Sequence, residues 1–206
     1  MQADSTTDLL VLEEATDGRR HWAFARSVGA EDGGMTMPAL RVSRADGKGM
    51  GAFATRDISA GERLIAEAPL ARWSTRRDES SEGKLQTFEH MVACLTPAQH
   101  DAILTLSQDA MHGTARSMLG TWLTNALPIN YDCATEQQLE EAAVFTTISR
   151  LNHACAPNCH HEWNGRLDME TVHALRSISR GEELTICCGP PHLSNACPQP
   201  PRPQAV

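Results

Sequence analysis

The chain has 206 residues, which corresponds to one large domain with tails at about 150 residues per domain. Hydrophobic residues make up 41% of the chain and charged residues 21%, as is typical of a globular protein. The formal net charge of −8 argues against a protein that wraps nucleic acid, because neutralising phosphates requires clustered Lys and Arg. The lack of a long apolar run and of a signal-like N-terminus predicts an intracellular protein, nuclear or cytoplasmic, that is not secreted.

The sequence changes in character near residue 39. Residues 1–38 are rich in Gly and acidic residues, which predicts a partly disordered N-terminal lead-in. Beyond them, short alternations of apolar and polar residues, broken by Gly, predict strands near residues 41–43, 50–54 and 63–67. We expect one folded domain over residues 39–188.

Residues 74–146 have a different pattern, in which helix formers replace the strand signals. Apolar residues at helical spacing between Leu85 and Leu95 predict one helix. Thr96 followed by Pro97 predicts the N-terminus of a second helix, because Thr is a good N-cap and Pro suits the first helical position. We therefore expect a helical insertion between two β-rich segments.

The C-terminal part returns to short strands, near residues 171–175 and 183–187. Residues 189–206 are rich in proline, which predicts a disordered tail. No internal repeat is evident. The seven cysteines are odd in number and irregularly spaced, which favours reduced thiols over a disulfide framework where no signal peptide precedes them.

The first candidate site is Gly49-Met50-Gly51, within the segment KGMGAFA. Two glycines that flank one residue allow a ligand to approach the backbone closely. A dinucleotide-binding loop would need a third glycine and a following helix, and this segment has neither. A tight hairpin turn is the alternative, since glycine is common in turns.

The second candidate site is the segment NHACAPNC, residues 152–159. Cys155 and Cys159 suggest zinc, but structural zinc sites use two closely spaced ligand pairs and the second pair is missing. Buried cysteines beside a turn at Pro157 are one alternative. A nucleophilic Cys155 beside His153 is another, although no group that would orient the histidine is evident.

A third segment, GEELTI at residues 181–186, is by itself a turn that enters a strand. In this order, the three segments together resemble the signatures of the SET-domain family of protein lysine methyltransferases. They appear here as KGMGAFATRDISAGERLIAEAPL, ISRLNHACAPNCHHEWN and VHALRSISRGEELTICC. The layout is most similar to split SET domains with a helical insertion, related to the MYND-finger group but without the MYND finger.

The resemblance implies a mainly β fold of small sheets with pseudoknot-like threading of the C-terminal segment, α+β overall with the helical insertion. It implies methyl transfer from S-adenosylmethionine to a lysine side chain of a histone or non-histone protein. An acidic chain favours a basic protein substrate, with no direct nucleic-acid or membrane binding. The donor would be bound by residues of the first two signatures, namely Lys48, Gly49, Met50, Gly51, Asn152 and His153.

The closing signature departs from the family pattern at Cys188, the catalytic position, where the family usually has a Tyr. A thiol is a weaker hydrogen-bond partner than a phenol. A proline-rich tail replaces the post-SET cysteines with which Cys155 would share a zinc ion, so we do not expect zinc. The alternative function is a catalytically weak or inactive SET module that serves as a protein-interaction domain. A zinc-dependent structural module is a third interpretation, and it requires stoichiometric metal.

Overall fold

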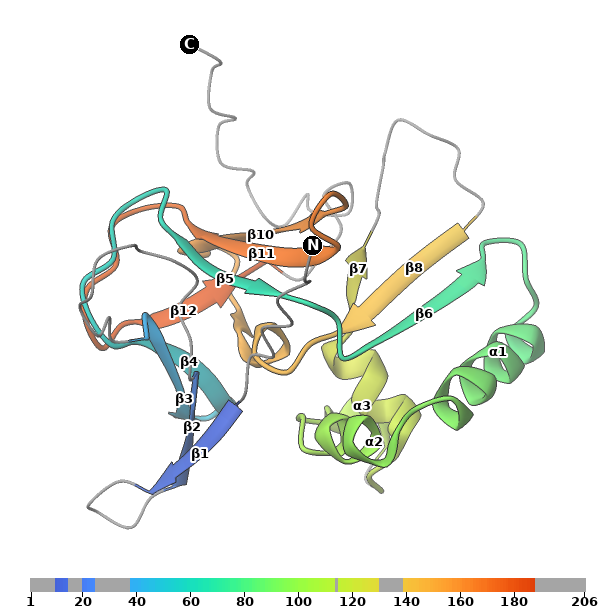
Figure 1. Ribbon diagram of the computed structural model, residues 1–206. Coiled ribbons are helices and arrows are strands. Elements are labelled where there is room, and N and C mark those ends of the chain that lie inside the picture. The colour runs from blue at the N-terminus through green and yellow to red at the C-terminus, as the bar shows by residue number, and fades with distance from the viewer. Residues whose placement is uncertain (1–9, 15–19, 25–37, 114, 130–138, 188–206) are drawn as a thin grey trace, which may run out of the picture.

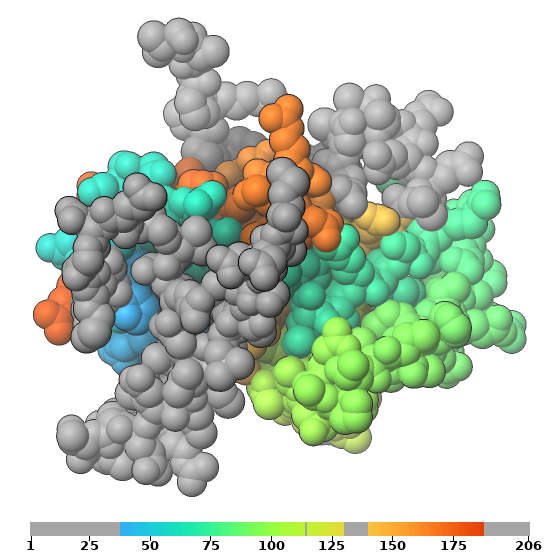
Figure 2. Space-filling model, in the orientation of Figure 1, coloured from blue at the N-terminus to red at the C-terminus, as the bar shows by residue number. Residues whose placement is uncertain are grey.

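The computed structural model describes residues 10–14, 20–24, 38–113, 115–129 and 139–187 (Figure 1). Its strands form three small sheets, and its α-helices gather at one side of the molecule, where Figure 2 shows them as a lobe. This is the mainly β architecture with helices that the sequence predicts. Among the described residues, no helix is long and apolar enough to cross a membrane.

The largest sheet has six strands in the order β1-β2-β3-β4-β12-β9. Neighbouring strands are antiparallel except for β12 and β9, which are parallel. The last strand of the chain thus lies between strands from its first and middle parts, as the pseudoknot-like threading requires. The strands are β1 (Leu10–Glu14), β2 (Arg20–Phe24), β3 (Leu40–Ala45), β4 (Gly49–Ala54), β12 (Glu183–Ile186) and β9 (Asn152–His153).

Two strands of this sheet, β1 and β2, fall within the stretch that we expect to be a partly disordered lead-in. β2 pairs with β3, so this part of the lead-in extends the edge of the largest sheet. The other residues before 38, and the proline-rich tail over 189–206, lie outside the described residues. The disorder expected for them stays a prediction.

The two smaller sheets have three strands each. In the first, His161, Val172 and Ile65 lie side by side, on the face where Val172 and Ile65 enter the core. The second sheet pairs the two ends of the insertion, because β6 pairs with β8. The first contains β10 (Cys159–Asn164), β11 (Met169–Ala174) and β5 (Arg63–Glu67), and the second β6 (Ala71–Arg76), β8 (Leu139–Val144) and β7 (Leu127–Ile129).

The insertion is helical in its middle and forms strands at its two ends. The N-cap predicted at Thr96 is confirmed, since its side chain and that of Gln99 form a reciprocal capping box at the start of α2. Two short 3₁₀ helices, η1 (Ala110–His112) and η2 (Ile148–Arg150), complete the helical elements of the described residues. The α-helices are α1 (Ser81–Ala93), α2 (Pro97–Leu104) and α3 (Met118–Asn125).

Three aromatic rings hold the helices against the second small sheet. Trp73 of β6, Phe88 of α1 and Trp122 of α3 meet edge to face, with ring centroids 5.4 to 6.4 Å apart. Phe88 and Trp122 are almost completely buried. Such pairs contribute about 0.5–1.5 kcal/mol each beyond the area they bury. The insertion therefore has a small core of its own.

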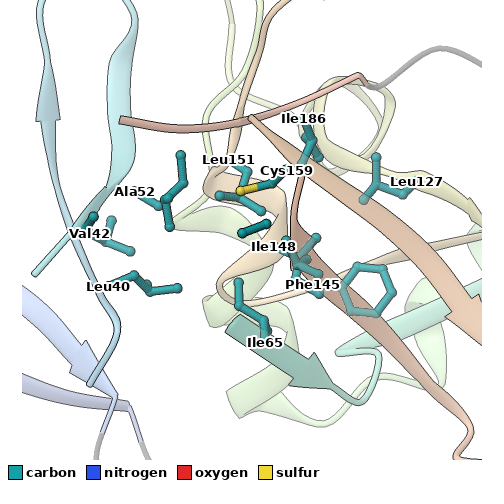
Figure 3. Close-up of a cluster of buried hydrophobic side chains, with 14 of the residues drawn as sticks. Leu40, Val42, Ala52, Ile65, Leu127, Phe145, Ile148, Leu151, Cys159 and Ile186 are labelled. Carbon is teal, nitrogen blue, oxygen red and sulfur yellow. The ribbon is translucent and has the colours of Figure 1, made fainter. Parts of the chain in front are cut away.

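The main core lies between the largest sheet and the first small sheet (Figure 3). Apolar side chains from both sheets meet there with residues of the segment that runs through η2 toward β9, and with Leu127, Ile129 and Ala143 of the second small sheet. Burial of these apolar side chains stabilises the fold mainly through the hydrophobic effect. The labelled members are Leu40, Val42, Ala52, Ile65, Leu127, Phe145, Ile148, Leu151, Cys159 and Ile186.

The structure shows an internal repeat, which corrects the expectation that there is none. Residues 54–64 and 174–184 share Ala-x-Arg-x-Ile-Ser-x-Gly-Glu-x-Leu at identical spacing. In each copy the Arg Nη2 lies 2.5 Å from the Glu Oε1, and the Glu Oε2 accepts the amide of the Ser. The glycines of both copies have positive φ, 81° and 86°. The repeat is hard to find by eye because the helical insertion separates its copies.

Candidate functional site

The first candidate segment forms the turn from β3 into β4. Lys48 donates its amide to the carbonyl of Ala45 at 3.1 Å, which closes the turn. Gly47 and Gly49 have φ values of 72° and 82°, in the left-handed region that residues with a Cβ rarely adopt. The hairpin interpretation is confirmed, because the glycines make the turn. The turn leaves the backbone of Gly49 exposed, and the approach of a ligand to it stays a prediction.

Asn152, in the second segment, joins this turn to the last strand. Its Nδ2 donates to the carbonyl of Met50 at 3.1 Å and to Oε1 of Glu183 at 2.7 Å. Its backbone pairs with Thr185 in the parallel β9–β12 ladder. Both amide hydrogens are thus used within the protein, so Oδ1 is the atom left to accept a hydrogen bond from a ligand.

Gly51 lies directly beneath this amide. A Cβ at this position would lie 2.9 Å from Nδ2 of Asn152 and 2.9 Å from Oε1 of Glu183. Contacts that short force atoms to move, so the second glycine of the segment is needed for close packing of β4 against Asn152. The two glycines are therefore needed for different reasons. Gly49 allows the positive φ angle of the turn, and Gly51 allows the side chains of Asn152 and Glu183 to pack against the backbone of β4.

Glu183 is a member of the site that the sequence analysis does not name as a candidate. Besides Asn152, it binds Lys48, whose Nζ lies 3.1 Å from its second carboxylate oxygen. The Lys48 side chain is 49% exposed, so this ion pair contributes little to stability. Its position in the third segment, GEELTI, was the signal in the sequence that could have identified it as a site residue. A pair of glutamates in a turn is usually solvated, which is why the sequence alone did not single it out.

Asn158 holds the start of β12 from the other side. This residue is 2% exposed, and its Oδ1 accepts the amide of Thr185 at 2.8 Å while its Nδ2 donates to the carbonyl of Glu183 at 2.7 Å. The same Nδ2 lies 3.1 Å from Oε1 of Glu182. The Arg176 guanidinium, hydrogen-bonded to Glu182, lowers the pKa of that carboxyl to about 2, so it is ionised at neutral pH.

His153 lies at the end of the same ladder, where its backbone pairs with Ile186. The next amide, of Ala154, donates to the carbonyl of Ile186 at 3.0 Å. The His153 side chain is exposed, and its Nε2 lies 3.7 Å from Sγ of Cys155. The structure therefore brings Lys48, Met50, Gly51 and Asn152 together around Glu183 and places His153 beside them through its backbone.

The η2 turn leads the chain into Asn152 and is held by the half-buried acid Glu67. Glu67, at the end of β5, accepts the amides of Thr147 at 2.9 Å and Ile148 at 3.0 Å. Burial raises the pKa of Glu67 to about 7, although these amides and the charge of Arg150 oppose the rise. Nothing in the sequence pattern marks this residue, because its partners are far along the chain.

Similarity to known protein families identifies the family of this chain. The SET-domain family model matches residues 49–189, more than half of the chain. The chain belongs to the SET-domain family. The match includes the β4 turn, β9 and β12, the three segments that meet at Asn152.

Curated relatives of this SET domain include "Histone-lysine N-methyltransferase set5" of Schizosaccharomyces pombe, 36% identical over 137 residues, or 66% of this chain and 38% of the relative. "Histone-lysine N-methyltransferase SMYD3" of Homo sapiens is 44% identical over 55 residues, 27% of this chain and 12% of the relative. The chain thus spans well under half the length of these relatives. A solved structure from Plasmodium falciparum covers 75% of this chain and 96% of its own at 13% identity, with a TM-score of 0.40, too low to add an argument.

A zinc ion does not have a ligand set among the described residues, which contain no group of three His, Cys, Asp or Glu that could hold a metal. Cys155 has His153 beside it, but Cys159 is buried, and burial raises the pKa of its thiol to about 12. A zinc-binding cysteine must be a thiolate. Zinc in this SET domain stays untested, since the chain beyond Cys187 lies outside the described residues.

Cys188, the position that we expect to be catalytic, also lies outside the described residues. The preceding residue, Cys187, follows β12 directly and is half-buried. Its carbonyl lies 3.1 Å from Nε2 of His161. The structure therefore describes what holds the chain immediately before residue 188.

Proposed function

We propose that this chain is the SET-domain part of a protein-lysine N-methyltransferase that uses S-adenosylmethionine. Membership in the SET-domain family and the similarity to histone-lysine N-methyltransferases support the proposal. The observation that carries it is the junction at Asn152, where the β4 turn, β9 and β12 are joined by the bonds to Met50 and Glu183. These are the three segments on which the resemblance rests, and they are distant in sequence.

Six residues would hold the methyl donor, and their chemistry fits it. The exposed backbone of Gly49 suits close approach by the amino-acid part of the donor, and the ammonium of Lys48 suits its carboxylate. Oδ1 of Asn152 would accept a hydrogen bond from its ammonium group. S-adenosylmethionine would supply a sulfonium methyl: a neutral lysine amine forms a bond to the methyl carbon, and the carbon–sulfur bond breaks to release the thioether S-adenosylhomocysteine. The six are Lys48, Gly49, Met50, Gly51, Asn152 and His153.

The chain contributes alignment and exclusion of water. The substrate lysine must lose its proton before it attacks, and a desolvated channel favours this by disfavouring the charged amine. Alignment of two bound reactants lowers the barrier further, by up to about 7–11 kcal/mol in favourable cases. Cys188 would stand where the family places its Tyr hydroxyl beside the transferring methyl.

The substrate is a protein lysine, and we infer that it lies in a basic segment. The net charge of −8 favours such a segment by electrostatic steering and disfavours nucleic acid. Histones are the first substrates to try, since the curated relatives are named for them, and non-histone proteins are the second. A nuclear or cytoplasmic location, away from the membrane, follows from such substrates.

Calorimetric titration of S-adenosylmethionine into the purified chain tests the donor site. We expect saturable binding that Asn152→Ala abolishes and Asn164→Ala preserves, because Asn164 lies in the β10–β11 turn, away from the junction. Transfer of labelled methyl groups to histones and to a basic protein array then tests the activity. A folded chain that binds no donor would refute the proposal.

A further inference from the structure

A buried histidine–glutamate pair lies outside the donor site and beside the end of β12. Nδ1 of His161, on β10, is 2.8 Å from Oε1 of Glu170, on β11. The two side chains are 15% and 1% exposed. Oε2 of Glu170 is also buried and has no hydrogen-bond partner among the described residues. The sequence suggests His161 only as a neighbour of the zinc candidates Cys155 and Cys159, and it does not single out Glu170.

The hydrogen bonds of His161 show that its Nε2 atom carries a hydrogen. Nε2 lies 3.1 Å from the carbonyl of Cys187, which can only accept. Nε2 therefore carries a hydrogen and donates it to Cys187. A second proton lies between Nδ1 and Oε1 of Glu170, which fixes the plane of the ring. Glu170 thus orients His161, and His161 binds the backbone of Cys187.

Two successive carbonyls at the end of β12 are held by different parts of the molecule. The carbonyl of Ile186 accepts the amide of Ala154, next to the donor site. The carbonyl of Cys187 accepts Nε2 of His161, from the first small sheet. Both hydrogen bonds act on the last described peptide groups of this part of the chain, so together they fix the end of β12 immediately before residue 188.

Stability alone is a poor explanation for this pair. Burying charged groups costs free energy, and replacing a buried ion pair by apolar residues is often neutral or stabilising. Val172 and Ile65 on the same face of the sheet are apolar, so an apolar pair would suit this face. The Glu170–His161 pair is instead hydrogen-bonded to the backbone carbonyl of Cys187, and so fixes the position of that carbonyl.

We propose that His161 and Glu170 are positioning residues that hold the Cys187 carbonyl and thereby fix the end of β12, from which the chain continues into residue 188. The proposal rests on the proposed function, because that function assigns residue 188 to the methyl-transfer site. It goes beyond that function by assigning a role to a pair on a different sheet.

Two double variants that differ in a single donor test it. His161→Leu with Glu170→Leu removes both polar groups, whereas His161→Gln with Glu170→Leu keeps an amide that can donate to Cys187. We expect both to fold with similar melting temperatures and to bind S-adenosylmethionine like the wild type. The Leu/Leu variant should lose about tenfold or more in kcat, and the Gln/Leu variant should recover most of it. His160→Leu, on the exposed face of β10, is the control.

Hydrogen exchange provides a readout that does not need catalysis. In the Leu/Leu variant the amide of Ala154, bonded to Ile186, should exchange about tenfold faster than in the Gln/Leu variant, while the amides of Ile58 and Ile178 should not change. Faster exchange in a chain that transfers no methyl group would refute the proposed function and leave the holding of Cys187 intact. Equal exchange and equal kcat in both variants would overturn the positioning role and leave the proposed function intact.

Discussion

Ile58 and Ile178 form a reciprocal pair across the molecule. Each donates its amide to the carbonyl of the other, at 2.9 and 3.0 Å, and both side chains are buried in the main core. They occupy the same place in the two copies of the internal repeat. The pair thus joins the segment that follows β4 to the segment that precedes β12, and so sets the relative position of two strands that meet at the proposed donor site.

The exchange of hydrogen bonds continues on both sides of this pair. Gly61 donates to the carbonyl of Ala174, and Gly181 donates to the carbonyl of Ala54, both at 2.8 Å. In each copy the carbonyl of the first residue accepts the glycine amide of the other copy, so each turn depends on both copies. The repeat therefore fixes β4 against β12 through hydrogen bonds within the protein.

Gly51→Ala should weaken both the fold and donor binding. The added Cβ would lie 2.9 Å from Asn152 and from Glu183, and crowding in a packed site typically costs about 1–3 kcal/mol. Urea denaturation and donor titration measure the two effects. Gly165→Ala is the matched control, since its Cβ would meet nothing closer than 3.8 Å. Unchanged donor affinity in Gly51→Ala would show that Asn152 can move without consequence.

Asn158→Ala should be among the most destabilising single substitutions near the site. The buried amide satisfies backbone groups of Glu183 and Thr185, and leaving such groups unpaired costs about 1–3 kcal/mol each. Thermal unfolding should show a fall in melting temperature of several degrees. Asn164→Ala, whose side chain binds only amides of an exposed turn, should cost much less. Equal losses from the two variants would contradict this account of β12.

Glu67 should make stability depend on pH between about 4.5 and 7. Burial raises its folded-state pKa to about 7 from an ordinary value of 4.5. A raised pKa means that the folded state binds the proton more tightly, so its contribution is fully present below pH 4.5 and is lost as the pH rises through about 7. Chemical denaturation at several pH values measures the slope.

Glu67→Gln should remove this part of the pH dependence, because the amide carries no ionisable proton and can still accept the amides of Thr147 and Ile148. Glu162→Gln is the control, since Glu162 is exposed on β10, which β11 separates from β5 in the same sheet. If the stability of Glu67→Gln fell with pH as steeply as that of the wild type over this window, another group would be responsible.

Cys188→Tyr should raise the rate of methyl transfer, because it restores the hydroxyl that the SET signature usually has at this position. Cys188→Phe has the same ring without the hydroxyl and should not raise it. Single-turnover methylation of a basic protein array, at saturating donor, measures the chemical step apart from donor binding. If Tyr and Phe changed the rate equally, the ring rather than the hydroxyl would be the cause.

Local pattern in the chain was enough to predict many of the elements. Alternation and turn residues predicted β3, β4, β5, β11 and β12 close to their observed bounds, and Thr96-Pro97 predicted the start of α2. These signals work because they depend on residues within a few positions of each other. The helix predicted for LEEAAV, after a capping box at Thr135 and Gln138, was wrong: residues Leu139–Val144 form β8. This segment has the composition of a helix, and its pairing with β6 exists only in the folded chain.

The candidate donor residues could also be named from the sequence, because each signature is contiguous and its glycine, asparagine and glutamate positions are recognisable. The contacts that bring these residues together could not be predicted from the sequence. The bond from Asn152 to Met50 spans 102 positions and that from Lys48 to Glu183 spans 135, and only the order of strands in the largest sheet brings them together. The pairing of His161 with Glu170 and Cys187 depends likewise on the packing of two sheets. Contacts between distant segments arise from burial of a shared core, which local pattern does not encode.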